Sequence, residues 1–573
     1  MRAFSWLRGR VSSAGPCPSS GRPRATGRPA PRRRPRLEAL EDRAVPAGGV
    51  LDPTFGSGGV VDSSLAASTR AFAVATYPRE GTANDGKIVA AGFAVGPGRN
   101  SYQFALVRYN LDGSLDKSFG GKGEVTGPTA SGAGAFDVVV QPDGKVVAAG
   151  ESNGDFALVR YNPDGTLDSK FGSRGVARTG ITSKSFDRVY AIALQADGKI
   201  VAVGGTNPAN SSSREVAVAR YNADGTLDTT FGDSIGGDPA LGKTGLAVDH
   251  IPTSPLEGGG TQGFGLAIDP GTGQIVVAAA NPTRLPQGYD AMVIRYKNDG
   301  TSDGTLDTSF AGNGYETFDG NVLPSLVFTG GLAIQPGDHR IVVAGRVSSG
   351  GPVTGLARLN PDGTLDGMLV STTTRDIGEV DAVRLQPDGR IVVGETGSVT
   401  FGTGNTLTVA RYNSDLTPDT SFGTGGVAGV PNVANPPDQQ LTDMAFEPDG
   451  RVVVTGWSTS VNGHVILARF LATGPRIGSF TADPSPATAG SPVALTANIT
   501  DGNPNGTVTQ VAFYYFDSGG VKQLLGYGDQ TSPGVWKFTF TVNLPPGSYA
   551  LFAQGVDTFG ALGDPVSLVL TVQ

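Results

Sequence analysis

Three short phrases recur along most of this chain, always in the same order. The first is Leu-Asp-x-x-Phe-Gly. The second is a Pro-Asp-Gly turn leading into an apolar run, as in QPDGKVVAAG from Gln141, and the third is an apolar run ending in Arg-Tyr-Asn, as at Arg160. A period of 52 to 79 residues indicates an array of similar structural units. The first phrase begins at Leu51, Leu115, Leu167, Leu227, Leu306, Leu365 and Pro418, and the last two copies are degraded.

Each of the seven units holds four short runs with strand character. In the third unit these runs lie around Val176 and at 190–194, 199–203 and 215–221. They are too short for globular helices, rich in β-formers, and bounded by Asn, Pro, Asp and Gly. A two-sheet sandwich does not repeat four strands at a fixed period. The pattern therefore predicts an all-β fold, a seven-bladed β-propeller with four strands per blade.

An Arg ends each unit, and an Asp follows eight residues later, opening the next blade, except after Arg295, where a doubled turn lengthens the gap. Asp52 has no such Arg before it and Arg469 has no such Asp after it. Because closure protects the terminal edges of a propeller, we predict that Arg469 approaches Asp52 as Arg160 approaches Asp168. A residue needed in every unit indicates a structural role. The repeated residues are Arg108, Arg160, Arg220, Arg295, Arg358, Arg411 and Arg469, with Asp52, Asp116, Asp168, Asp228, Asp307, Asp366 and Asp419.

The Asp-Gly pairs predict hairpin turns, because Asp bonds to its own turn and Gly supplies a positive φ without strain. Calcium binding is the alternative, since Asn162, Asp164 and Asp168 present oxygens at short spacing. That loop lacks the ninth-position ligand and the bidentate Glu of an EF-hand. We expect turns and assign no catalytic, cofactor-binding or metal residue in the chain; calcium at these turns is the only cofactor considered.

The phrases LDxSFG, QPDGKVVAAG and FALVRYNPDGTLD resemble the delta-60 repeat family of bacterial, often exported, proteins. The resemblance covers residues 51 to about 471. It implies a β-propeller and an extracellular or cell-surface location, and it supplies no catalytic residues. The fourth unit departs most from the pattern, with an insertion at 233–262 and a doubled turn from Asn298 to Asp307. Its long loops are the expected ligand or partner surface.

The spacing of short strand-like runs in residues 476–573 predicts a separate Ig-like β-sandwich, and this segment contains no cysteine. Tyr549 lies where a tyrosine corner would, two residues ahead of Leu551, and Trp536 is expected in the core rather than on a sugar-stacking surface. The segment resembles bacterial Ig-like domains of surface proteins. Its seven expected strands lie at 477–482, 493–499, 510–515, 524–527, 535–542, 548–556 and 566–572.

Residues 1–48 form an Arg-rich tail. Eleven Arg and three acids give residues 1–47 a charge of +8, and since the whole chain carries −8, the remainder carries −16. Without an apolar pattern, this tail is expected to be disordered. It has no standard signal-peptide core, and no stretch of the chain is apolar enough for a transmembrane helix. The acidic body would repel nucleic acid, so none is expected as a partner. Residues 34–48 resemble the LExLEDR segment of exported bacterial proteins, which implies export.

Signals of catalysis are weak. A Ser-His-Asp triad has only His250, His339 and His464 as bases, and none lies in a nucleophile-elbow context. The acids outside the repeat pattern are expected to be solvated at strand edges and in loops. They are Asp155, Asp187, Glu215, Asp290, Glu316, Glu379 and Asp381.

The sequence therefore favours a non-enzymatic role and leaves catalysis open. We expect an exported or cell-surface binding or structural protein with a monomeric propeller ring at 49–473, whose partner is an extracellular protein or polysaccharide. The alternative is a secreted carbohydrate-active hydrolase or lyase that uses paired carboxylates.

Overall fold

The fold of the described residues is all-β, as predicted. In this part of the chain every named element is a strand, and the strands form nine four-stranded sheets. The tail at 1–48 lies outside the described residues. The computed structural model describes residues 49–573 except 64–68, 79, 81, 97, 99–100, 182–185, 208–213, 234–242, 250, 252–260, 283–288, 319–325, 348–352, 371–376, 387–388, 398–405, 431–438, 449, 459–463, 472–474, 502–506, 517–521, 558–562 and 564–565.

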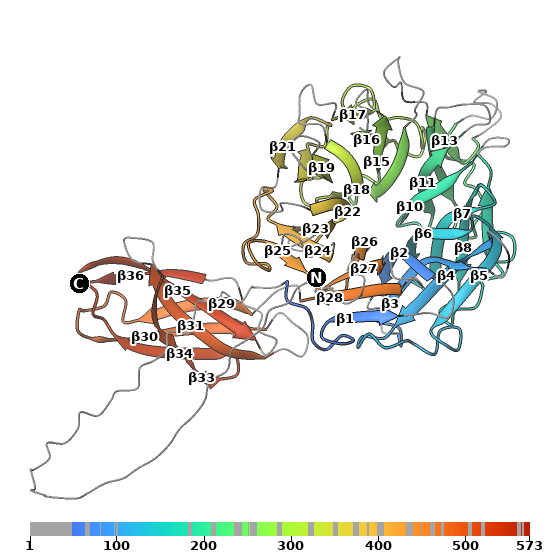
Figure 1. The fold of residues 1–573 in the computed structure, drawn as a ribbon. Helices are drawn as coiled ribbons and strands as arrows, with labels where there is room; N and C mark the ends of the chain where they lie inside the picture. Colours follow the sequence, from blue (N-terminus) through green and yellow to red (C-terminus); the bar gives the residue numbers. More distant parts are fainter. Residues whose placement is uncertain are drawn as a thin grey trace, which may run out of the picture. The chain divides into compact units, whose positions relative to one another are not determined.

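Seven of these sheets draw their strands from residues 60–470 and follow one another around a ring (Figure 1). Each sheet is antiparallel, and its first strand lies innermost. The first strands are β2 (Thr69–Thr76), β6 (Gly134–Val140), β10 (Arg188–Leu194), β14 (Gln262–Ile268), β18 (Leu326–Ile334), β22 (Ile377–Leu385) and β26 (Gln439–Phe446). The second strands are β3 (Ile88–Val95), β7 (Val146–Ser152), β11 (Ile200–Thr206), β15 (Ile275–Pro282), β19 (Ile341–Val347), β23 (Ile391–Gly397) and β27 (Val452–Ser458).

The third and fourth strands complete each sheet toward the outside of the ring. The second and third strands are buried nearly throughout because a neighbouring sheet packs on each face, which explains their unbroken apolar runs. The third strands are β4 (Ser101–Tyr109), β8 (Asp155–Tyr161), β12 (Glu215–Tyr221), β16 (Tyr289–Tyr296), β20 (Val353–Leu359), β24 (Thr406–Tyr412) and β28 (His464–Phe470). The fourth strands are β5 (Glu124–Ser131), β9 (Val176–Thr179), β13 (Leu246–Asp249), β17 (Tyr315–Thr317), β21 (Leu365–Val370), β25 (Val427–Gly429) and β1 (Val60–Ser63).

The sheets are offset by one strand from the units read in the sequence. We grouped the run around Val176 with the three strands that follow it, but β9 pairs with β8 of the preceding sheet. The reason is the fold of the Leu-Asp-x-x-Phe-Gly phrase. Leu167 bridges back to Tyr161, and the backbone amide of Asp168 donates to the carbonyl of Arg160 at 2.9 Å. The phrase is therefore a turn inside one sheet, and the prediction that its Asp opens the next blade is wrong.

The predicted contact between the ends of the repeat region is confirmed. β1 pairs with β28, with Val60 opposite Ala468, so the first described strand completes the sheet formed by the last three strands of the ring. Asp52 accepts from Nε of Arg469 at 3.0 Å and from Nη2 at 2.9 Å. Two segments more than 400 residues apart in sequence thus share one sheet, and β1 covers the edge of β28 that would otherwise be unpaired.

All seven predicted Arg–Asp pairs form, at 2.5 to 2.9 Å. In six of them the guanidinium also lies over a Phe ring, and we call each such set of Arg, Asp and Phe a node. The degraded phrase at Leu365 has no Phe beside the Arg358–Asp366 pair. In the first node, Arg108 bonds Asp116, its guanidinium lies 4.5 Å over the ring of Phe119, and Nη1 donates to the carbonyl of Pro163 in the next sheet at 2.5 Å. The amide of Gly120 also donates to the next sheet, to the carbonyl of Asp164 at 2.8 Å. The predicted structural role of these Arg residues is confirmed.

Residues 476–572 form the two remaining sheets. Their order is β29 (Arg476–Asp483), β30 (Pro492–Thr500), β34 (Val535–Thr541) and β33 (Asp529–Ser532) in one sheet, and β32 (Lys522–Tyr527), β31 (Val508–Phe516), β35 (Gly547–Asp557) and β36 (Val566–Val572) in the other. There are eight strands rather than the seven expected. The sequence missed β33 because its four residues are polar and exposed, and pairing with β34 alone defines it.

The sandwich core bears out two predictions about single residues. Trp536 is 7% exposed and packs with Val511, Phe513 and Leu551, so it is a core residue. The hydroxyl of Tyr549 donates to the carbonyl of Pro545 at 2.9 Å, the backbone contact expected of a tyrosine corner.

We predict that Arg469→Met and Arg160→Met reduce the free energy of unfolding by similar amounts, about 3 kcal/mol each, because each breaks a buried ion pair together with the bonds from its guanidinium to the next sheet. Arg178→Met is the control, since Arg178 pairs with Asp155 at the surface and its loss is worth under about 1 kcal/mol. Urea titration of each variant measures the change. If the Arg469 variant has the same free energy of unfolding as the Arg178 variant, the Asp52–Arg469 contact does not stabilise the ring as we predict.

Candidate functional site at the central cavity

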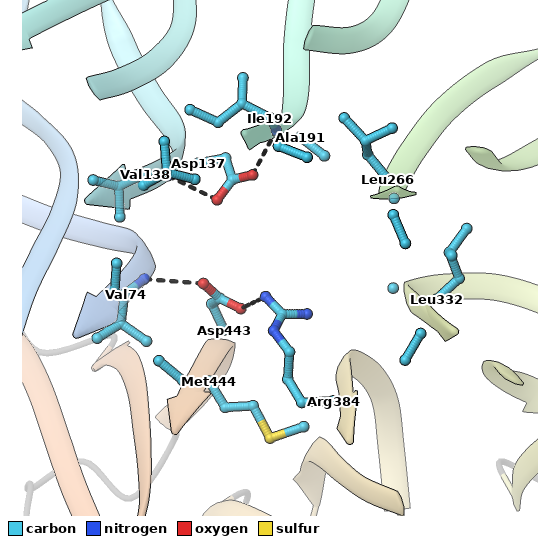
Figure 2. Close-up of a pocket in the computed structure, with 18 of the residues that line it drawn as sticks. Val74, Asp137, Val138, Ala191, Ile192, Leu266, Leu332, Arg384, Asp443 and Met444 are labelled. Carbon is cyan, nitrogen blue, oxygen red and sulfur yellow. Dashed lines mark hydrogen bonds and ion pairs between the residues drawn. The ribbon is translucent and has the colours of Figure 1, made fainter. Parts of the chain in front are cut away.

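The seven innermost strands surround a cavity of about 650 Å³, to which every one of the seven sheets contributes residues. This volume lies within the range of small-molecule pockets, about 300–1,000 Å³. Figure 2 shows Asp137, Asp443 and Arg384 grouped in the cavity, with Leu266 and Leu332 across from them. The cavity thus has a charged part and an apolar part.

Besides Phe446 on β26, four aromatic side chains line the cavity on four consecutive sheets. They are Phe72, Phe136, Tyr190 and Phe264, all half-buried, and we call them the aromatic arc. Successive ring centroids lie 5.3, 5.9 and 4.9 Å apart.

A break in strand register places each member of the arc. The pairing between first and second strands shifts at these four residues, so each is the extra residue of a β-bulge. A bulge leaves its residue out of the ladder and re-aims its side chain. On β22 and β26 the corresponding residues are Asp381 and Thr442, which also line the cavity.

The residue after the bulge is an acid on two strands, Asp137 on β6 and Asp443 on β26. Asp137 accepts the amides of Val138 and of Ile192 on the next sheet, both at 2.7 Å. Asp443 accepts the amide of Val74 on β2 at 2.9 Å and Nη2 of Arg384 at 2.8 Å (Figure 2). Each carboxylate therefore joins two sheets while facing the cavity.

The two acids differ in their charge partners. Burial, with the nearby charge of Asp443, raises the pKa of Asp137 to about 7. Burial also raises the pKa of Asp443, and the Arg384 guanidinium opposes that rise. No Lys or Arg of the described residues forms an ion pair with Asp137. Near neutral pH the cavity thus holds a carboxyl group on the verge of ionisation, the property expected of a functional residue.

The other acids named from the sequence have several environments. Asp381 lines the cavity and accepts the Thr396 hydroxyl at 2.8 Å. Asp187 is fully buried and accepts the Thr206 hydroxyl at 2.6 Å and the Ile181 amide at 2.8 Å, so its prediction as a solvated acid is wrong. Its neighbouring donors explain how it is buried. Asp155 is half-buried in an ion pair with Arg178, and Glu215 and Glu316 are half-buried. The side chains of Asp290 and Glu379 lie outside the described residues.

Among the described residues, His339 and the Asp-Gly turns are not part of the cavity lining. Nδ1 of His339 is 2.9 Å from Oδ1 of Asp269, in a contact between turns. His250, the His464 side chain and most of the insertion at 233–262 lie outside the described residues.

In the turn considered for calcium, Oδ1 of Asp164 accepts the amide and hydroxyl of Thr166 at 2.9 and 2.7 Å. Asp168 pairs with Arg160 instead of turning toward Asp164. These contacts are those of the predicted turn. Within the described part of the chain, no group of three or more His, Cys, Asp or Glu side chains is placed to hold a metal ion.

Sequence reasoning assigned no residue of this cavity except Asp381. A signal was present in the sequence, because an aromatic residue precedes a small or acidic residue at the same place in four units. The aromatic residues are Phe72, Phe136, Tyr190 and Phe264. It could not be interpreted without the bulges, since regular alternation would have aimed the rings differently.

Fold and cavity together define a β-propeller with a ligand-sized central site. Six segments match a family model described as "Domain of unknown function (DUF5122) beta-propeller", at residues 83–119, 141–171, 195–231, 337–367, 386–422 and 447–474. They cover all three recurring phrases, which agrees with the delta-60-type repeat. No curated protein matches this chain.

Several solved structures share a distant likeness. The propeller domain of the Trilobed protease from Pyrococcus furiosus is 9% identical, with 67% of this chain and 89% of that chain covered and a TM-score of 0.36. The acylaminoacyl peptidase of Pyrococcus horikoshii is 11% identical, with 75% and 57% covered and a TM-score of 0.36. The α-L-arabinofuranosidase Arb93A of Fusarium graminearum is 11% identical, with 61% and 94% covered and a TM-score of 0.35. At these scores no argument rests on the likeness.

The described residues include no helix with the length and hydropathy needed to cross a membrane.

We predict that Asp137 makes the protein less stable as pH rises. Its folded pKa of about 7 lies above its ordinary value, so its favourable contribution is complete below about pH 4 and is lost as pH passes through about 7. Melting temperatures between about pH 5 and 8 should therefore fall for the natural chain relative to Asp137→Asn. In Asp443→Asn the fall should move to lower pH, because the neighbouring charge is gone. Parallel pH profiles for the natural chain and Asp137→Asn contradict the prediction.

Proposed function

We propose that this chain is an exported or cell-surface binding protein that takes up carbohydrate at the central cavity. The observation that carries the proposal is the aromatic arc. Aromatic rings offer large, rigid apolar surfaces on which a sugar ring can stack. The carboxylates of Asp381 and Asp443 and the Arg384 guanidinium supply hydrogen-bonding groups beside it. A cavity lined by apolar and aromatic side chains with a few converging polar groups is the usual form of a ligand site.

We further propose that residues 49–473 are a monomeric seven-bladed propeller and that residues 476–573 are an Ig-like module. Seven four-stranded sheets and the Asp52–Arg469 contact support the first, and the Trp536 core with the Tyr549 contact supports the second. Export rests on the resemblance of residues 34–48 to the LExLEDR segment, and the surface location also on the resemblance to delta-60 repeats. Residues 1–48 would then be an export segment with no part in binding.

A glycan and protein array probed with the full chain tests the proposal. We expect carbohydrate binding that Phe136→Ala weakens about tenfold or more, because the arc loses a central ring. Tyr527→Ala is the matched control, since Tyr527 is an exposed aromatic of the C-terminal sandwich. Binding that survives Phe136→Ala and disappears in Tyr527→Ala contradicts a site in the cavity, and binding of proteins alone contradicts carbohydrate as the ligand.

Asp137 and Asp443 also support a second candidate, a carbohydrate-active hydrolase or lyase. A carboxyl group with a pKa near 7 can act as a general acid, and a neighbouring carboxylate paired with Arg384 can act as nucleophile or base. Product analysis of polysaccharides incubated with the full chain separates the two functions. Products that disappear in Asp137→Asn and persist in Asp155→Asn favour the enzyme, and bound but uncleaved saccharide favours the binding protein.

A further inference from the structure

We propose that the central cavity selects a saccharide carrying a free, protonated amine, with the sugar ring against the aromatic arc and the ammonium group on the carboxylate of Asp137. The inference rests on the proposed function and names the class of sugar that the same site takes. Three features of the described residues carry it: Asp137 has no ion pair, more acids than cations line this part of the cavity, and an Arg side chain already lies over the aromatic arc.

Asp137 forms no ion pair with a Lys or Arg of the described residues, although the nearby Arg384 charge favours its ionised form. It accepts two backbone amides, whereas Asp443 has the Arg384 guanidinium at 2.8 Å. The charged groups facing this part of the cavity are Asp443 on β26 and Asp381 and Arg384 on β22, in addition to Asp137 on β6. Three carboxyl groups and one guanidinium therefore line this part of the cavity, and a ligand that brings a positive charge improves the balance. A neutral sugar leaves it unchanged, and an acidic sugar worsens it.

The arc already accommodates a cation from the protein itself. The guanidinium of Arg188 lies 4.8 Å from the ring centroid of Phe136 and 5.9 Å from that of Tyr190. Its charge is balanced by the buried Glu151, with Nη2 and Oε2 2.7 Å apart. Arrays of aromatic rings attract cations through their negative faces. Rings of the arc and the carboxylate of Asp137 both line the cavity, so the cavity offers a ligand the same two kinds of group, aromatic ring and carboxylate, that Arg188 contacts.

The proposal has a consequence for protons. Burial and Asp443 keep Asp137 protonated in mildly acidic solution, since they raise its pKa to about 7. An ammonium group is bound best by the ionised carboxylate, so Asp137 gives up its proton when the amine arrives. The proton passes to the buffer, the amine keeps its own, and no covalent bond changes. A neutral sugar at the same place causes no such release.

The experiment compares the glucosamine tetramer with its fully N-acetylated counterpart, using the full chain and calorimetric titration at about pH 5.5, where the amines are protonated. We expect the tetramer with free amines to bind about tenfold or more tightly. Titration in two buffers of different ionisation enthalpy should show about one proton released per bound chain. Asp137→Asn should abolish both the preference and the release. The natural chain alone tests both, even where that variant fails to fold.

Two results overturn the inference and leave the proposed function standing: equal or tighter binding of the acetylated tetramer that Phe136→Ala weakens, and preference for the free amine without proton release. Tighter binding of a lysine tetrapeptide than of the glucosamine tetramer overturns the assignment to a saccharide. Failure of every saccharide on the array removes the proposed carbohydrate function together with the inference.

Discussion

The node formed by an Arg, an Asp and a Phe holds the sheets of the ring to one another. Within a sheet the Arg anchors the turn between the third and fourth strands, because Asp accepts the guanidinium and the Phe ring lies beneath it. Between sheets the same guanidinium and the turn glycine reach carbonyls of the next turn, as from Arg469 to Leu111 at 2.6 Å. One set of residues thus ties sheet formation to sheet packing. Breaking one node removes a buried guanidinium from its carboxylate, which is more costly than losing a surface ion pair. A second cation stays near some of these carboxylates, as Arg451 does at 2.9 Å from Asp52.

A ring fixed at the nodes can tolerate irregularity at its centre. The innermost strands carry bulges that interrupt their pairing, yet each is held by the second strand of its sheet and by neighbouring sheets. Asp137 and Asp443 add amide contacts between adjacent first strands. The bulges free Phe72, Phe136, Tyr190 and Phe264 to line the cavity. The bulged residues and polar groups at the centre are therefore supported by the surrounding sheets, the arrangement that a pre-formed binding site requires.

Much of the frame could be predicted from the sequence, because its causes are local and repeated. The turns follow from Asp-Gly chemistry, the strands from short apolar runs, and the pairing of Arg469 with Asp52 from counting the partners of a repeated residue. The assignment of strands to sheets failed by one position, since nothing local distinguishes a turn inside a sheet from a link between sheets. The pairing of β9 with β8 and the bridge from Leu167 to Tyr161 decide it.

The site was much less predictable. Asp137, Asp443 and Arg384 are separated by 59 residues or more, and only the ring brings them together. The acids named from the sequence were chosen because they lie outside the repeat pattern. Asp137 and Asp443 instead lie at a regular position of the repeat, directly after the bulge, where β2 has Ala73 and β10 has Ala191. An acid in place of alanine at a regular position of the repeat was the better indication of a site residue. The burial of Asp187 was missed because its donors, the Thr206 hydroxyl and the Ile181 amide, are brought to it by the strands and loop on either side, which the sequence pattern did not place.

The central claim is that the cavity inside the ring is where this protein meets its ligand. Hydrogen–deuterium exchange of the full chain, measured with and without saturating glucosamine tetramer, tests it most directly. The account predicts slower exchange confined to the innermost strands, foremost β6 and β10, where Asp137 joins the amide of Ile192. Slower exchange confined to the outer strands or to residues 476–573, with the innermost strands unchanged, would contradict it.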